Sequence, residues 1–118
     1  MLASEILKQA KSLLTPETWG KGNDVGRVES PRLCAAQAVD RAVRTLQGKL
    51  CTREGLAAYC LLGATATGYN YGGNIPMWND RPERTLQDVH DAFDAAIVIA
   101  EQREQVQTVQ LEIVTCSH

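Results

Sequence analysis

Residues 75–97 read IPMWNDRPERTLQDVHDAFDAAI, and this stretch decides the fold. Thr85-Leu86-Gln87-Asp88 has the form of a capping box, with Asp in place of the usual Glu or Gln. Apolar residues then recur at the spacing of one helical face, at positions 86, 89, 93, 96, 97 and 100. The stretch therefore predicts an amphipathic helix that begins at Thr85. Directly before this helix lies Trp78-Asn79-Asp80, a segment whose residue types do not favour a helix.

Two helices are expected near the N-terminus. Ser4 is a candidate N-cap, and the apolar residues from Ile6 to Leu14 share one face of a helix that stops before Pro16. Ser30-Pro31 has the pattern of an N-cap followed by proline at the first helical position. The second helix is therefore expected to begin there and to continue to about residue 50.

A third helix is expected after Thr52, a candidate N-cap. Its residues from Leu56 to Leu62 are apolar nearly all round, which is typical of a buried helix, so we expect it to be the central one. Glycine, proline and polar residues interrupt the helices at TPETWGKGNDVGRVES and GATATGYNYGGNIP, which predict two long loops.

The C-terminal tail has a different pattern. Val109, Leu111 and Ile113 alternate with more polar residues, and β-branched residues are frequent, which favours a strand. A frayed helical extension is the alternative. A lone strand needs a partner edge, either the loop near Val25–Val28 or the same tail in a second copy. The second option would make the protein a homo-oligomer.

The predicted fold is therefore mainly α: a compact four-helix domain with two long loops and a C-terminal strand or extension. Residues 1–104 form the single helical domain, and residues 105–118 form the extension that could oligomerise. A chain of 118 residues suits one domain with one core.

Composition excludes several function classes. The formal charge of -2 argues against a nucleic-acid polymer as partner, because such binders usually carry a basic excess. No apolar run is long enough for a membrane span, and the charged start MLASEILKQAKSLL is no signal peptide, so a cytoplasmic protein is expected. The four cysteines form no C-x-x-C pair, so we expect reduced thiols, no metal site and no cofactor.

Charge is unevenly distributed along the chain. Residues 32–53 hold five basic residues against one acid, whereas residues 80–104 hold seven acids against three arginines. This segregation predicts two helices that lie against each other or against a second copy. Two solvated faces are the alternative, since surface ion pairs contribute little.

Cys34 is a candidate reactive thiol. It is expected in the first turn of the second helix, where the helix dipole can lower a thiol pKa, with His90 or His118 as a base. Cysteine is also among the most often buried residues, and His90 flanks the apolar stripe of its helix. We favour the structural interpretation, so no catalytic residue is assigned.

The segment around Trp78 is the best candidate for a ligand site. Trp78 offers a flat apolar surface, Asn79 and Asp80 offer polar groups, and the guanidinium groups of Arg81 and Arg84 match phosphate or carboxylate. Upstream, Tyr69, Asn70 and Tyr71 could add stacking groups beside the same helix N-terminus. In the alternative, which we favour, Trp78 anchors the loop while Asn79 and Asp80 bind loop backbone.

Three sequence segments, in this order, resemble those of a known family: LLTPETWGKG (Leu13–Gly22), LCAAQAV (Leu33–Val39) and residues 75–97. The family is an uncharacterised one of short proteins from actinobacteria and their phages. Its members carry a Pro-x-x-Trp segment after the first helix, Cys-Ala at a helix start, and Trp-Asn-Asp-x-Pro-x-Arg-Thr before the last helix. The matching residues are Cys34, Trp78, Asn79, Asp80, Pro82, Arg84 and Thr85.

The resemblance covers roughly residues 5–100. Members tend to have histidine after the motif's threonine, where this chain has Leu86, so a family Cys–His pair would be missing here. The resemblance implies a bacterial or phage context and no established activity.

The leading functional hypothesis is a non-catalytic protein that binds a small anionic molecule, which in a phage could be a nucleotide-derived host signal. One alternative is a protein–protein interaction module that inhibits a host enzyme through the acidic helix face or the tail. The other is a hydrolase that depends on Cys34.

Overall fold

The computed structural model describes residues 2–25, 31–49, 51–68 and 73–116, and within this part the chain is mainly α with no sheet. The prediction of a mainly α fold is confirmed. The elements are α1 (Ala3–Ser12), the 3-10 turn η1 (Gly22–Asp24), α2 (Ala35–Gln47), α3 (Arg53–Thr67), α4 (Ile75–Asn79) and α5 (Leu86–Cys116). The short helix α4 is additional to the four helices that the sequence predicts.

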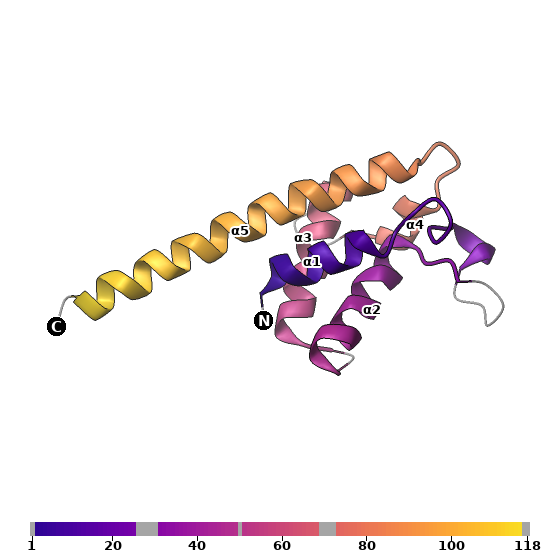
Figure 1. Ribbon diagram of the computed structural model, residues 1–118. Coiled ribbons are helices and arrows are strands. Elements are labelled where there is room, and N and C mark those ends of the chain that lie inside the picture. Colours follow the sequence, from indigo (N-terminus) through magenta and orange to yellow (C-terminus); the bar gives the residue numbers. More distant parts are fainter. Residues whose placement is uncertain (1, 26–30, 50, 69–72, 117–118) are drawn as a thin grey trace.

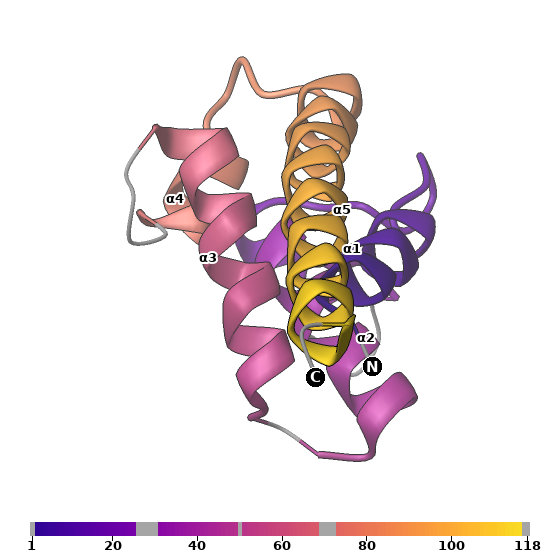
Figure 2. The same cartoon turned by 90° about the vertical axis from the view of Figure 1, so that its left-hand side faces the viewer.

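Helix α1 packs against α2, α3 and α5, and in Figure 1 it lies between α5 and α2. Helix α3 packs against α1, α2, α4 and α5, and Figure 2 shows it beside α5. Ile6, Leu7 and Ala10 of α1 are fully buried. The other large buried apolar side chains are Leu14, which follows α1, and one or two from each remaining helix: Val39, Leu62, Ile75, Val89 and Phe93.

The contacts of α3 with α1, α2, α4 and α5 are those expected for a central helix, but α3 is not buried on all sides. Helix α3 buries Ala58, Leu61 and Leu62, but the side of α3 that bears Leu56 is open, and Leu56 is 62% exposed. The apolar composition of α3 reflects small residues rather than burial all round. A close approach to α2 is one reason for them, because a Cβ at Gly55 would lie 2.7 Å from a methyl of Val43.

Helix α2 begins later than the Ser30-Pro31 pattern predicts. Its N-cap is Cys34 and its first residue is Ala35, whereas Ser30 lies outside the described residues. Leu33 is extended because it pairs with the loop after α1: its N–H donates to the Thr18 carbonyl (2.7 Å), and its carbonyl accepts from the Gly20 N–H (3.0 Å). This tertiary pairing delays the helix.

Two predicted caps are present. The hydroxyl of Thr52 accepts from the Gly55 N–H (2.9 Å) at the start of α3. At the start of α5, the Asp88 N–H donates to the Thr85 hydroxyl (3.1 Å), and the Thr85 N–H donates to the Asp88 carboxylate (3.0 Å). These contacts involve residues three apart, so the local pattern was sufficient to predict them.

Ser4 does not cap α1, because it lies inside the first turn of that helix. The cap comes from α5 instead. The carboxylate of Glu104 accepts from the Ser4 N–H (3.2 Å) and from the Ser4 hydroxyl (2.6 Å), so a negative charge sits at the positive end of α1.

The predicted C-terminal strand is wrong. Helix α5 continues without a break from Leu86 to Cys116, and its last turns project beyond the other helices (Figure 1). Of the two alternatives, the helical extension is correct. The physical reason is cooperativity: extending a helix that is already nucleated costs far less than starting one, and no partner strand lies beside the tail in the described residues.

The charge pattern predicted that the acidic helix would lie against the basic segment 32–53 or against a second copy, with two solvated faces as the alternative. The structure pairs acids of α5 with α1. The long-range ion pairs of α5 in the described part of the chain go to α1, where Lys11 lies 2.6 Å from Asp94 and Lys8 lies 3.1 Å from Glu101. Helix α1 separates α5 from α2, so lysines of α1 meet the acids first.

Candidate functional site: the Trp78 segment and its groove

The centre of the Trp78 segment is Asn79, which is fully buried. Its amide oxygen accepts from the indole N–H of Trp19 (2.8 Å) and from the backbone N–H of Ala35 (3.1 Å). Its amide nitrogen donates to the Gly20 carbonyl (3.0 Å). One side chain therefore joins α4, the loop after α1 and the start of α2.

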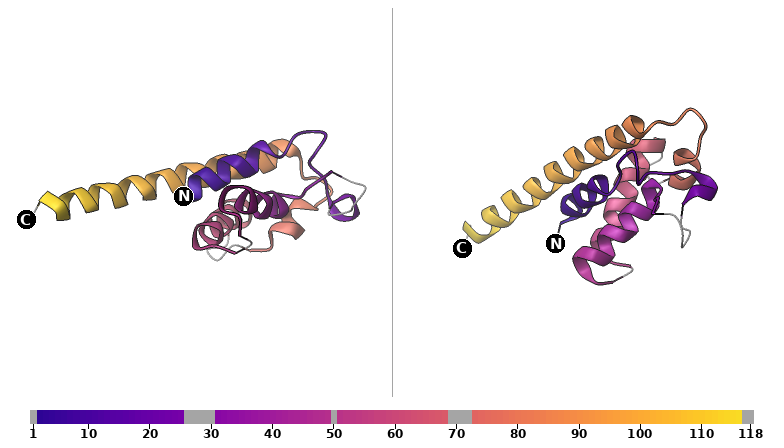
Figure 3. Two further views of the ribbon diagram at one scale, coloured as in Figure 1. Left: turned by 60° about the horizontal axis from the view of Figure 1, so that its bottom comes forward. Right: turned by 45° about the vertical axis from the view of Figure 1, so that its right-hand side comes forward.

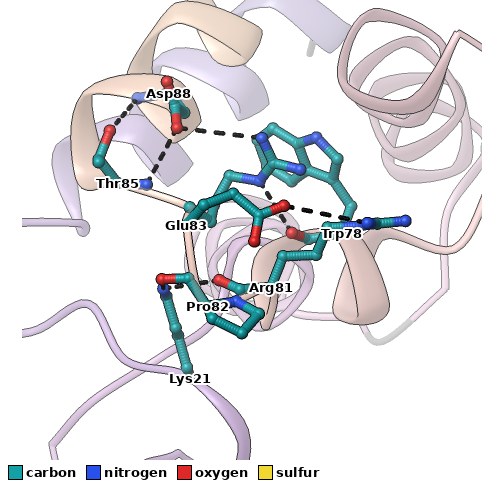
Figure 4. Close-up of polar contacts among 8 residues, drawn as sticks. Lys21, Trp78, Arg81, Pro82, Glu83, Thr85 and Asp88 are labelled. Atoms are coloured by element: carbon teal, nitrogen blue, oxygen red, sulfur yellow. Dashed lines mark hydrogen bonds and ion pairs between the residues drawn. The ribbon is translucent and has the colours of Figure 1, made fainter.

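The neighbouring residues reinforce this junction. The carboxylate of Asp80 accepts from the Gly22 N–H (2.9 Å) and from the Asn79 amide (3.1 Å). From the opposite direction, the Lys21 ammonium donates to the carbonyls of Arg81 (2.8 Å) and Pro82 (3.2 Å), as Figure 4 shows. Asn79 and Asp80 thus act as a structural clamp, which answers the question that their sequence raised.

Trp78 and Arg84 are engaged with each other. The guanidinium of Arg84 lies 4.1 Å from the centroid of the Trp78 ring, and its Nε donates to the Trp78 carbonyl (2.9 Å). It also lies 3.9 Å from the Asp88 carboxylate, and only 17% of the Arg84 side chain is exposed. The cation–π contact and the hydrogen bond hold the Arg84 guanidinium on the ring.

Beside this pair lies an open groove of about 500 Å³. It is formed by the C-terminal end of α3, by α4 and by the connection from α4 to α5. Its lining residues are Ala66, Thr67, Asn74, Met77, Trp78, Arg81, Glu83 and Arg84. The groove combines apolar side chains with two cationic groups and one acidic group.

Arg81 is the most accessible cation of the groove. Its side chain is 64% exposed, and its closest acidic group is the Glu83 carboxylate at 3.9 Å. That distance is too long for a strong hydrogen bond, and exposed pairs of this kind contribute little. Of the two predicted anion-binding arginines, Arg81 is therefore the one whose guanidinium faces solvent, whereas Arg84 is held in packing.

The structure brings only part of the predicted site together. Trp78, Arg81 and Arg84 line the groove, whereas Asn79 and Asp80 point into the clamp with Trp19 and Gly22. Tyr69, Asn70 and Tyr71 lie outside the described residues.

Five lining residues were not predicted as site residues: Ala66, Thr67, Asn74, Met77 and Glu83. Asn74 carried a signal, because Asn before Ile-Pro is typical of an N-cap, and its side chain accepts from the Met77 N–H (3.0 Å). Met77 lies one residue before Trp78 and projects into solvent. No local pattern links Thr67 to this groove.

Cys34 lacks the surroundings of a nucleophile. It is 5% exposed, and burial raises the pKa of its thiol, although hydrogen bonds from the Gln37 and Ala36 backbone at the start of α2 lower it to a smaller extent. His90 is engaged elsewhere, since its Nε2 donates to the Leu14 carbonyl (2.8 Å). His118 lies outside the described residues.

Neither a metal cluster nor a membrane helix emerges from the part of the chain that the structure covers. In that part, no three His, Cys, Asp or Glu side chains are grouped so that they could hold a metal ion. Likewise, none of its helices is long and apolar enough to cross a bilayer.

Residues 1–98 match the model of a family described as a family of unknown function, DUF6197, and the chain belongs to that family. The expectation of an uncharacterised family is confirmed. No curated protein matches the chain significantly, and no solved structure does either.

Proposed function

We propose that this protein is a non-catalytic binding protein that holds a small anionic molecule in the groove beside Trp78. The observation that carries the proposal is the exposed guanidinium of Arg81 at the edge of an open groove that is lined by both apolar and polar side chains. Ligand sites usually combine an apolar surface with a few polar groups that fix orientation.

The charges of the groove favour an anion. Arg81 and Arg84 contribute two positive charges, and Glu83 contributes one negative charge. A phosphate or carboxylate can accept two parallel hydrogen bonds from one guanidinium, which is a better partner for Arg81 than Glu83 at 3.9 Å. The anionic group of the ligand would therefore displace the weak contact between these two residues.

The apolar part of the groove favours a ring or another flat group. Met77 is exposed and adaptable, and Trp78 is half-buried, so the two give the ligand an apolar contact surface. Because Arg84 already covers Trp78, the ligand would contact the remaining exposed part of the indole together with Met77. A nucleotide-derived molecule combines such a ring with an anion.

In a bacterial or phage setting, a protein of this kind could act in the host cytoplasm by sequestering a nucleotide signal. Sequestration needs only binding, which agrees with the buried thiol of Cys34 and with the structural role of His90.

The predicted alternative of a protein-docking acidic face on α5 has less support. Asp88 caps its own helix, Asp91 accepts from Gln87 (2.8 Å), and Asp94 pairs with Lys11 of α1 (2.6 Å). These carboxylates are engaged within the chain.

The test is a binding screen with nucleoside monophosphates and cyclic dinucleotides, read as a thermal shift and then as a dissociation constant. Arg81→Ala should weaken the ligand that binds by about 10- to 100-fold, since one charge-assisted contact contributes about 1.5–3 kcal/mol. Arg44→Ala is the matched control, because Arg44 is an exposed arginine of α2. Equal affinities for Arg81→Ala and the unmodified protein would reject this groove as the site.

A further inference from the structure

The outward face of α5 changes character along the helix. Ala100 is buried and marks the inward face, and each residue of a helix advances by about 100°. Asp91, Val98, Gln102, Gln105 and Val109 therefore lie roughly opposite Ala100. The first part of this outward face carries charge at Asp91, whereas residues 98–109 of the face carry none.

An uncharged outward face is unusual for a helix in contact with water. Val98, Val106 and Val109 are 53%, 55% and 46% exposed, and Val106 lies at the flank of the outward face. Around them lie Gln102, Gln105 and Gln110.

The projecting part of α5 also has a low intrinsic helix propensity. Val106, Thr108 and Val109 are β-branched, and residues 105–110 contain no charged residue that could form a stabilising pair along the helix. Residues this far along α5 extend past the ends of α1 and α3 (Figures 1 and 3). A helix of this composition gains stability when its apolar face packs against another surface.

We propose that the outward face of α5 binds the same face of α5 in a second copy, with the two helices antiparallel. In a two-fold arrangement centred between Arg103 and Glu104, Val98 lies opposite Val109 of the second copy, and Gln102 lies opposite Gln105 of the second copy. The spacing is thus self-complementary: apolar side chains meet apolar ones, and amides meet amides.

The distribution of charge on the outward face favours a second copy as the partner and an antiparallel orientation of the two helices. An uncharged face gives no attraction to a strongly acidic or basic protein, and it meets its own copy without like-charge repulsion. A parallel pair would place Asp91 beside Asp91 of the second copy, which is unfavourable. An antiparallel pair places the two helical bodies at opposite ends and keeps these acids apart. The proposal is independent of the groove beside Trp78.

The test uses Val98→Glu and Val109→Lys, each made in the full chain and measured by sedimentation equilibrium. Both changes replace a β-branched residue with a better helix former, so α5 should remain helical in circular dichroism. The unmodified protein should show twice its 12.9 kDa chain mass, and each variant alone should dissociate at least about tenfold more readily.

Mixing the two variants provides the decisive result. In the antiparallel pair, the carboxylate introduced by Val98→Glu in one chain would face the ammonium introduced by Val109→Lys in the other. The mixture should therefore dimerise more strongly than either variant does alone. Gln107→Glu, on the opposite side of α5, should dimerise like the unmodified protein. A monomeric unmodified protein, dimerisation of either variant at full strength, or a mixture without recovery would overturn the proposal.

Discussion

The side-chain amide of Asn79 contacts three separate segments of the chain: Trp19 and Gly20 after α1, Ala35 at the start of α2, and its own neighbour Asp80. Without it, the Trp19 indole N–H, the Ala35 N–H and the Gly20 carbonyl would lose this hydrogen-bond partner, whereas the Asp80 carboxylate would still accept from the Gly22 N–H. Buried polar groups that lose their partner cost more than the hydrogen bond itself contributed, so much of the order around the groove depends on this residue.

Replacement of Asn79 by alanine should lower the free energy of unfolding by about 2–4 kcal/mol, because it leaves the Trp19 indole N–H, the Ala35 N–H and the Gly20 carbonyl without a partner. Urea denaturation measures the change. The control is Asn74→Ala, which removes the exposed cap of α4 and should cost about 1 kcal/mol. Similar small losses for both variants would show that Asn79 is not a clamp.

Cys34 should react slowly with alkylating reagents. Burial raises the pKa of its thiol, so the reactive thiolate is scarce near neutral pH, whereas Cys51 is exposed. With iodoacetamide at about pH 7.5, peptide mapping should show modification of Cys34 at least about tenfold more slowly than of Cys51. Faster modification of Cys34 than of Cys51 would revive the hydrolase hypothesis.

The raised pKa of the Cys34 thiol also predicts that the stability of the fold depends on pH. The folded protein keeps the Cys34 proton at a pH where the unfolded chain has lost it, because the pKa is raised on folding. The free energy of unfolding should therefore fall as the pH rises through the ordinary thiol range of about 8.5, and Cys34→Ala should reduce that fall.

The sequence identified the Trp78 segment as the part of the chain to examine, but it predicted the roles of the individual residues only in part. The polar residues Asn79 and Asp80 beside a proline are typical of a structural turn, and this interpretation agrees with the clamp. The partners could not be predicted, since Trp19 lies 60 positions away and no local spacing connects it with Asn79.

At the scale of elements, local patterns predicted what local contacts determine. The box of Thr85 and Asp88 and the cap at Thr52 join residues three apart, and both are present. The start of α2 depends on the pairing of Leu33 with the loop near Trp19, and the cap of α1 depends on Glu104, a hundred positions from Ser4. Sequence patterns within one helix carry no information about such partners.

A substitution at Gly55 tests how closely α2 packs against α3. Alanine normally favours a helix, but a Cβ at this position would lie 2.7 Å from Val43 and 2.9 Å from the Thr52 hydroxyl. Gly55→Ala should therefore lower the free energy of unfolding by about 1–3 kcal/mol. Leu56→Ala, at the next and exposed position, should change it by less than about 1 kcal/mol. A stabilised Gly55→Ala variant would show that the helices can separate without cost.

At the scale of the whole molecule, the main departures from expectation are the incomplete burial of α3 and the conformation of the C-terminal tail. The apolar composition of residues 56–62 favoured α3 as a buried, central helix. Helix α3 does contact α1, α2, α4 and α5, but Leu56 lies on its open side. The conformation of the tail was harder to predict, because its alternation of apolar and polar residues is also typical of a strand. Only the contacts of a segment in three dimensions distinguish a strand from a helix in such a case. Its continuity with α5 determines the outcome.

The two proposed surfaces lie on different parts of the molecule. The groove is formed by α3, α4 and the connection from α4 to α5, and the uncharged face lies on the later turns of α5. Loss of one function should therefore leave the other intact, and variants of Val98 or Arg81 can be interpreted separately.

Native mass spectrometry of the protein, purified from its own cellular background, tests the proposed binding function most directly. We predict a discrete retained mass of an anionic small molecule on the unmodified protein and on Arg44→Ala, and its loss on Arg81→Ala. A retained mass that persists on Arg81→Ala, or a ligand-free spectrum for all three proteins, would contradict the assignment of this groove as a ligand site.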